Sequence, residues 1–167
     1  MPSTSLYNRV DLTVGGVSVS VYYMGVTNYA LANNRIPVVQ HIFVDSDEEL
    51  ADPTPVGEIS VHASVDGDQL FTSGPITLPS MDPGTTNFLE PYDLTRVPVA
   101  RTLESTEARG GELTISVKLG DELAQETVDL QVLAPDEWFN SPLYYESLAA
   151  FVQPNSASVT PRLRTVG

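Results

Sequence analysis

The stretch RVDLTVGGVSVSVYY, residues 9–23, decides the fold class. Apolar residues occupy every second position on either side of a glycine pair, Gly15-Gly16. Successive side chains of a β-strand point to opposite faces, so this alternation predicts two strands that each bury one face. The apolar positions are Val10, Leu12 and Val14 before the glycines, and Val17, Val19, Val21 and Tyr23 after them.

Similar strand signals continue to Leu133. Most of the segments alternate, but residues 37–44 are more continuously apolar, which predicts a strand covered on both faces. Turn signals separate the segments, notably Asp66-Gly67, residues 82–84 and Gly120-Asp121. We expect about seven to nine short strands and no alternation with helices, a pattern typical of an antiparallel β-sandwich. The clearest later segments are 59–65, 76–78, 113–119 and 128–132.

The pattern changes in PDEWFNSPLYYESLAAFVQPN, residues 135–155. Ser141-Pro142 is a good helix start, and Pro154 disfavours helical geometry just before it, so we predict a helix over 142–152. We therefore divide the chain into a β-sandwich, residues 1–134, and a C-terminal helix with a tail, residues 135–167. The helix should dock on the sandwich, with Trp138 closing the seam, or on whatever follows it. Its apolar stripe consists of Tyr144, Tyr145, Leu148, Phe151 and Val152.

The charge of the chain limits its partners. Twenty-two acidic residues against eight basic ones give a formal net charge of −14. Phosphate backbones and anionic membranes attract Lys and Arg clusters, so we expect neither direct nucleic-acid binding nor membrane binding. The absence of cysteine rules out disulfides and thiolate metal sites. The N-terminus has no signal-peptide pattern and no apolar run is long enough to span a membrane, so we expect a cytoplasmic protein.

An acidic run, residues 45–52, suggests a calcium loop because carboxylates recur at alternate positions. The central glycine of such a loop is missing, and its twelfth position is Val56 rather than glutamate. We therefore favour a solvated loop between strands and expect no metal or other cofactor.

Catalysis would require side chains that converge on one site. The two histidines are His41, which we expect to pack within its strand, and His62, on the polar face of its strand. No nucleophile elbow, zinc-binding helix motif or glycine-rich phosphate loop is present. We expect that this chain alone is not an enzyme, and a small hydrolase that uses Asp and His residues is the weakest alternative.

Several segments are similar to the N-terminal region of very large prokaryotic helicase–nuclease proteins, whose leading domain has no known function. Together they extend over most of the chain from Tyr23, and the last is the most specific. These segments are 28–33 (NYALAN), 36–39 (IPVV), 78–94, 111–115 (GELTI), 132–138 (VLAPDEW) and 148–155 (LAAFVQPN).

The resemblance implies an immunoglobulin-like sandwich and a role as an accessory module in antiviral or mobile-element defence. In such proteins an ATP-dependent helicase core follows, often with a nuclease domain, but no helicase motif occurs in this chain. We therefore expect a non-catalytic interaction module that binds a protein partner or the downstream domain of the same polypeptide. The expected interaction surface comprises Trp138, Tyr144, Tyr145 and Phe151, together with the acidic loops.

A rival interpretation is an extracellular sandwich that binds carbohydrate or protein. Its exposed aromatic residues would be Tyr22, Tyr23 and Trp138. For Trp138 itself, packing at the seam between strand and helix is the simpler expectation.

Overall fold

The computed structural model describes residues 8–90, 95–103, 106–135 and 137. Within these residues the chain forms ten strands and two short helices. In chain order they are β1 (Asn8–Val14), β2 (Val17–Tyr23), β3 (Val26–Thr27), α1 (Tyr29–Asn33), β4 (Val39–Ser46), β5 (Gly57–Val65), β6 (Asp68–Thr72), β7 (Ile76–Leu78), β8 (Thr86–Leu89), α2 (Val99–Leu103), β9 (Arg109–Leu119) and β10 (Glu122–Val132).

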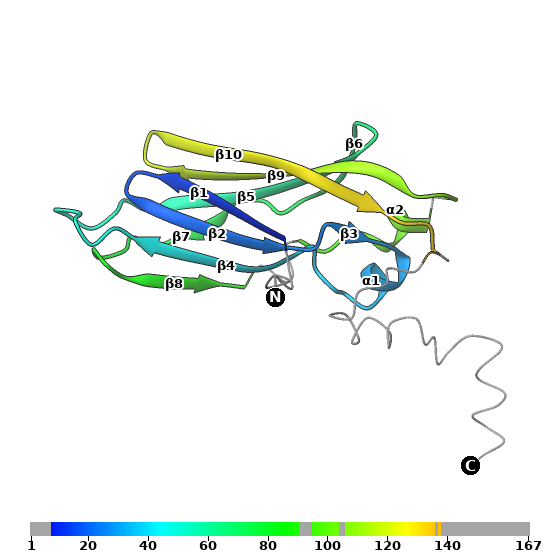
Figure 1. The fold of residues 1–167 in the computed structure, drawn as a ribbon, viewed down its shortest axis with the longest axis horizontal. Coiled ribbons are helices and arrows are strands. Elements are labelled where there is room, and N and C mark those ends of the chain that lie inside the picture. The colour runs from blue at the N-terminus through cyan, green and yellow to red at the C-terminus, as the bar shows by residue number, and fades with distance from the viewer. Residues whose placement is uncertain (1–7, 91–94, 104–105, 136, 138–167) are drawn as a thin grey trace, which may run out of the picture.

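The strands form two sheets that pack face to face (Figure 1). The four-stranded sheet has the order β1-β2-β4-β8, and the six-stranded sheet has the order β3-β10-β9-β5-β6, with β7 also paired to β5. This confirms the prediction of a mainly β, sandwich-like fold. Among the described strands, all pairs are antiparallel except one, in which β3 runs parallel to β10.

Three hairpins have two-residue turns that begin with a residue of positive φ. Gly15 and Gly16, which join β1 to β2, have φ of 54° and 74°. Asp66-Gly67 joins β5 to β6 and Gly120-Asp121 joins β9 to β10, as the sequence predicted. Both central residues have positive φ in the first two turns, whereas in the third only Gly120 does, with φ of 59°. Such turns suit the right-handed twist of the flanking strands, and glycine adopts positive φ without steric cost.

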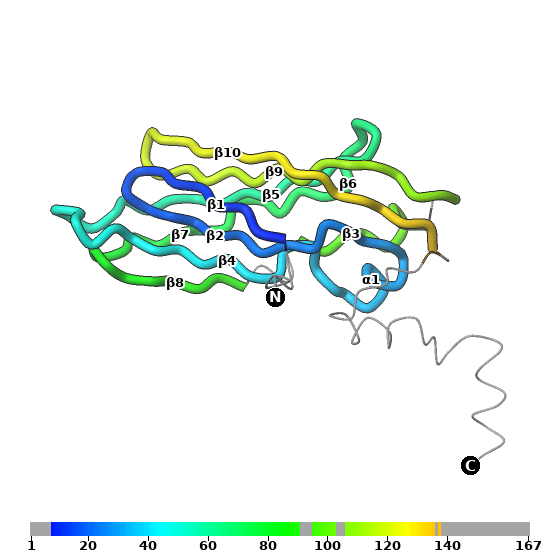
Figure 2. Tube along the Cα trace, viewed as in Figure 1, coloured from blue at the N-terminus to red at the C-terminus, as the bar shows by residue number. Residues whose placement is uncertain are grey.

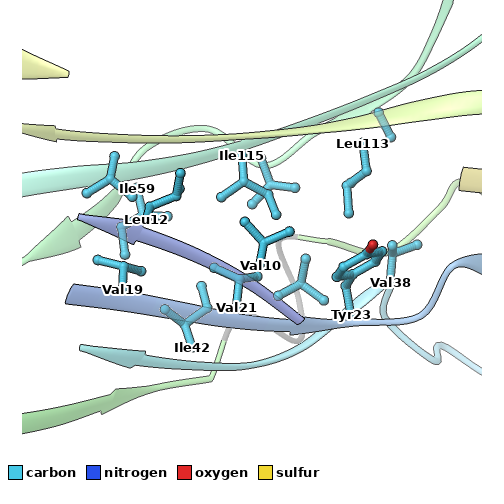
Figure 3. Close-up of a cluster of buried hydrophobic side chains, with 14 of the residues drawn as sticks. Val10, Leu12, Val19, Val21, Tyr23, Val38, Ile42, Ile59, Leu113 and Ile115 are labelled. Atoms are coloured by element: carbon cyan, nitrogen blue, oxygen red, sulfur yellow. The ribbon is translucent and has the colours of Figure 1, made fainter. Parts of the chain in front are cut away.

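The core lies between the two sheets and consists of the alternating residues of their inner faces (Figure 3). Val17, Val19 and Val21 of β2 are fully buried, as are Ile59 on β5 and Ile115 on β9. The alternation that predicted the strands is therefore the alternation that fills the core.

The prediction that residues 37–44 are covered on both faces was wrong. On β4, Ile42 and Val44 are fully buried, but Phe43 between them is 37% exposed. The segment looked continuously apolar because an aromatic residue occupies an outward position of an ordinary half-buried strand.

Besides pairing with β9, β10 contacts the other sheet. The trace in Figure 2 shows β1 beside β9 and β10, so the two sheets approach each other along this side. Glu122 and Glu126 share the inward parity of Leu130 on β10, yet both are exposed. The Glu122 carboxylate accepts a hydrogen bond from the Gly15 N–H at 3.1 Å, which ties the two hairpin turns together.

Both described helices are five residues long and lie inside the chain rather than at its C-terminal end. The sequence does not predict these helices, because five residues show less than two turns of periodicity. The predicted helix 142–152 lies outside the described residues and stays a prediction. Of residues 135–167, the structure describes only Pro135 and Glu137.

Asn28 connects α1 to the segment that follows β10. Its Oδ1 caps the helix by accepting the Leu31 N–H at 3.0 Å, and its Nδ2 donates to the Glu137 carbonyl at 3.2 Å. The Glu137 carboxylate in turn accepts the Ala134 N–H at 2.8 Å. Two segments of the family resemblance, 28–33 and 132–138, therefore meet through one fully buried amide.

The packing of the core predicts the effect of truncating one side chain. Ile115→Ala should lower the free energy of unfolding by about 2–5 kcal/mol, because it leaves a cavity between the sheets. Ser116→Ala, at the next position on the solvent-facing side of β9, should change it by less than about 1 kcal/mol. Urea unfolding of both variants measures this, and equal midpoints would contradict the two-sheet core.

The Asn28 contacts predict a second effect on stability. Asn28→Ala removes the helix cap and the bond to Glu137 from a buried site, so it should cost about 1–3 kcal/mol of unfolding free energy. Asn28→Ser keeps a capping oxygen and should cost less. If both variants unfold like the parent chain, the connection between α1 and Glu137 contributes nothing to stability.

Candidate functional site

The outer face of the four-stranded sheet carries a cluster of aromatic side chains. Strand register brings them together: Tyr22 on β2 lies opposite His41 on β4, and Phe43 on β4 lies opposite Phe88 on β8. We call Tyr22, His41, Phe43 and Phe88 the aromatic face. It extends across three adjacent strands although its residues span 67 positions of sequence, from 22 to 88 counted inclusively.

The rings of the aromatic face contact one another. The Phe43 and Phe88 centroids are 5.0 Å apart, and Tyr22 meets Phe43 edge-on at 5.7 Å with an interplanar angle of 82°. The His41 ring lies 5.6 Å from Phe88. Such aromatic pairs across strands stabilise a sheet, and here they also hold the rings in fixed positions.

Much of this ring surface remains open to solvent. Phe43 is 37% exposed and Phe88 is 42% exposed, and the two are adjacent. The other two large apolar residues exposed in the described part of the chain lie elsewhere, Val56 just before β5 and Leu123 on β10. Scattered apolar residues are ordinary on a protein surface, whereas a contiguous apolar patch is typical of an interaction site.

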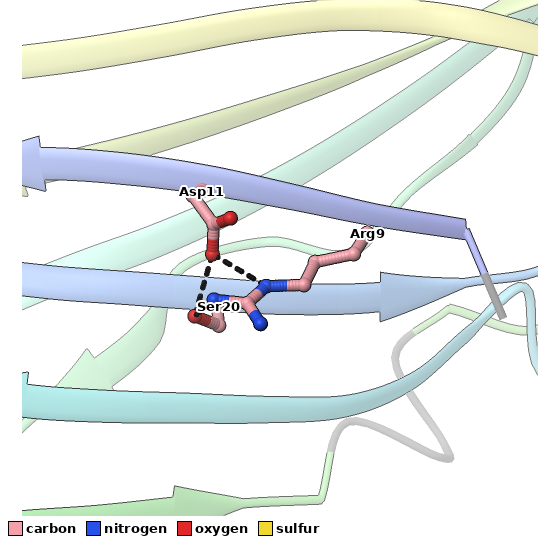
Figure 4. Close-up of polar contacts among 3 residues, drawn as sticks. All are labelled: Arg9, Asp11 and Ser20. Carbon is pink, nitrogen blue, oxygen red and sulfur yellow. Dashed lines mark hydrogen bonds and ion pairs between the residues drawn. The ribbon is translucent and has the colours of Figure 1, made fainter. Parts of the chain in front are cut away.

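A polar network borders the aromatic face on β1 and β2 (Figure 4). Arg9 Nε donates to Asp11 Oδ1 at 2.7 Å, and Ser20 Oγ donates to the same oxygen at 2.7 Å. The Arg9 guanidinium also lies 5.6 Å from the centroid of the Tyr22 ring. The arginine is thus held between a carboxylate and an aromatic ring.

This network shifts the pKa values of Arg9 and Asp11. The hydrogen bond to Asp11 is the main cause that raises the pKa of Arg9. Burial alone would raise the pKa of Asp11, but hydrogen bonds from Ser20 and Arg9 and the arginine's charge lower it overall. Both groups therefore stay charged at neutral pH, and the pair presents little net charge to solvent.

The outer face of the six-stranded sheet has a different character. Thr114 and Thr127 hydroxyls pair across β9 and β10 at 3.0 Å, and Ser116 donates to Gln125 at 3.3 Å. Polar side chains that satisfy one another are typical of a solvated face. The two outer faces of the sandwich are therefore unlike, and the aromatic one is the candidate site.

The aromatic residues expected to bind carbohydrate do not lie together on one surface. Tyr22 belongs to the aromatic face, but Tyr23 is 7% exposed and points into the core, so its expected exposure was wrong. Trp138 lies outside the described residues. So do the other residues of the expected interaction surface, Tyr144, Tyr145 and Phe151.

The two histidines lie on different sheets. His41 packs against Phe88 on the aromatic face, whereas His62 on β5 is exposed and its Nδ1 lies 2.8 Å from the Thr72 hydroxyl. His62 occupies the polar side of its strand, as predicted. The two histidines therefore lie on opposite sides of the sandwich and belong to different surroundings.

The acidic run forms part of a turn. Asp47 Oδ1 accepts the Glu49 N–H at 3.0 Å, and Asp45 Oδ1 accepts the Thr86 hydroxyl at 2.5 Å. In the part of the chain that the structure describes, no three acidic or histidine side chains are grouped so that they could hold a metal ion. No described helix is long and apolar enough to cross a membrane.

Phe43 and Phe88 are site residues that the sequence alone did not predict. The apolar run 37–44 predicts a doubly covered strand, but Phe43 shares the parity of Asp45, which indicates an outward face. Phe88 lies in a four-residue strand, too short for its alternation to be noticed.

The comparisons with known proteins leave the family open. No family model matches the chain, and no curated protein matches it significantly. A solution structure of a protein from Arabidopsis thaliana aligns with 84% of this chain and 91% of its own, at 13% identity and a TM-score of 0.38. A match with so low a TM-score carries no argument about function.

The buried Tyr23 hydroxyl predicts how the stability of the fold changes with pH. Burial raises the pKa of its hydroxyl, and the charge of Asp129 on β10 raises it further. A raised folded pKa means that the stabilising effect is complete below the unfolded value of about 10 and is lost as pH rises through the folded value.

We therefore expect Tyr23→Phe to lose less unfolding free energy than the parent chain between pH 7 and pH 11. Tyr22→Phe, which removes a neighbouring hydroxyl from the outer face, is the matched control. Urea unfolding at both pH values measures the difference. A parent and a Tyr23→Phe variant with the same alkaline loss would show that Tyr23 ionises as freely as in the unfolded chain.

Proposed function

We propose that this chain is a non-catalytic interaction module that binds a protein partner, or the downstream domain of the same polypeptide, through its aromatic face. The observation that carries the proposal is the pair of adjacent, half-exposed rings of Phe43 and Phe88. Aromatic residues are enriched in protein interfaces because they bury a large area at a small entropic cost.

The sheet supports this role by holding the rings rigidly. The inward neighbours of Phe43, Ile42 and Val44, are fully buried, so the backbone beneath the ring is fixed by the core. A preorganised surface loses little conformational entropy on binding. The aromatic face can therefore bind without rearrangement of its own strands.

We also propose the kind of larger protein in which this module acts. The segments that resemble helicase–nuclease proteins support a cytoplasmic accessory module of such a defence-type protein, with an immunoglobulin-like sandwich. The contact between two of those segments, through Asn28 and Glu137, is compatible with this assignment. The charge of −14 supports the further proposal that this chain does not itself bind nucleic acid.

A second candidate function, carbohydrate binding, is favoured by one observation. The Tyr22 ring lies beside the charged pair Arg9 and Asp11, and sugar sites combine an aromatic surface with polar groups. The protein-binding proposal is stronger because the most exposed rings are phenylalanines, which have no polar atoms to place beside a sugar hydroxyl.

A selection experiment tests the proposal. Immobilised parent chain is used to select binders from a library of random dodecapeptides, and the same chain is screened on a glycan array. We expect retained peptides and no retained glycan. Phe43→Thr combined with Phe88→Thr should weaken peptide binding at least tenfold, because truncating central aromatic residues commonly removes most of the affinity.

The control is Leu123→Thr, which removes a 64% exposed apolar side chain from β10 on the other sheet. It should leave peptide binding unchanged, and thermal unfolding should show that all variants fold. Peptides that bind the double variant as well as the parent would place the interaction elsewhere. Retained glycans that are lost from the double variant would favour the carbohydrate function.

A further inference from the structure

The charges around the aromatic face are predominantly negative. Asp45 shares the outward parity of Phe43 on β4, two residues along the strand, and is exposed. Glu90 directly follows β8 and is also exposed, and Asp11 lies on β1. Arg9 on β1 is a cation on this side, and its Nε–H donates to Asp11 at 2.7 Å. Among the described residues, these three carboxylates and this guanidinium sum to a charge of −2.

Asp45 differs from Asp11 in its surroundings. Its Oδ1 accepts a hydrogen bond from the neutral Thr86 hydroxyl, and within the described residues it forms no ion pair. Thr86 is its register partner on β8, as Phe88 is the register partner of Phe43. An uncompensated carboxylate therefore stands beside the exposed rings on the same two strands.

A second copy of this chain does not suit the surface. Two aromatic faces packed against each other would bring the carboxylates of both copies together. Each copy also has a formal net charge of −14, so the repulsion extends over the whole molecule. The charge pattern instead complements a partner that is apolar and basic.

We propose that the aromatic face binds a partner segment in which apolar side chains stand next to a lysine or arginine. The aliphatic part of the basic side chain packs on the Phe43 and Phe88 rings, and its charged group reaches Asp45. The same face already contains a cation beside a ring, since Arg9 lies 5.6 Å from the Tyr22 centroid. Long basic side chains bury their stems on apolar surface in this way, and aromatic faces attract cations.

The inference rests on the proposed function, and the selected peptides test it separately. The sequences of the dodecapeptides retained by the parent chain should combine aromatic or aliphatic residues with at least one Lys or Arg. Asp45→Asn should weaken the binding of these peptides about two- to fivefold, the range of an exposed ion pair. Raising the salt concentration should weaken binding to the parent in the same direction.

Asp45→Asn keeps an oxygen that can accept the Thr86 hydroxyl, so the strand pairing is preserved. The matched control is Glu112→Gln, which removes one negative charge from the outward side of β9 on the other sheet. It should change binding by less than twofold at physiological salt.

The outcomes separate the two proposals. Peptides that depend on Phe43 and Phe88 but are neutral or acidic, or that bind Asp45→Asn unchanged, would overturn the basic partner and leave the interaction module standing. Peptides that bind without Phe43 and Phe88 would overturn the proposed function as well. Concentration-dependent dimers of the parent, lost in Phe88→Thr, would show that a second copy occupies the face instead.

Discussion

The packing of alternating valines and isoleucines between the two sheets is the constraint on which the rest of the structure depends. Val19 and Val21 face Ile59 and Ile115 across the core, and none of these side chains is exposed. Because a strand has a period of two, burial of these residues determines the parity of every other residue on the same strands. The outward positions of Tyr22 and Phe43 follow from the inward positions of their neighbours.

The aromatic face is thus a consequence of the core and of strand register together. The core turns Phe43 outward on β4, and the pairing of β4 with β8 then places Phe88 beside it. A slip of one residue in that pairing would send Phe88 to the other side of the sheet. Geometry at the surface therefore depends on packing underneath it, although the rings themselves add little to the core.

The sequence was sufficient to predict the longer strands but insufficient to predict the shortest strands and the site. The alternation of residues 10–23 and the turns at Asp66-Gly67 and Gly120-Asp121 depend on neighbouring residues, so they were visible in the sequence. The site joins residues 22, 41, 43 and 88, and their proximity depends on which strands pair and in what register. β3 was also unpredictable, because two residues that pair in parallel with β10 have no periodicity of their own.

The glutamates at inward positions of β10 have a consequence for how the molecule behaves in concentrated solution. A strand with open hydrogen-bonding groups can recruit a strand of another molecule, and such growth leads to aggregates. A foreign strand that extended the sheet beside Glu126 would have to bury that carboxylate, and Glu122 is already bonded to the turn of β1 and β2. The acidic side chains on β10 therefore oppose fibril-like assembly at this edge of the six-stranded sheet.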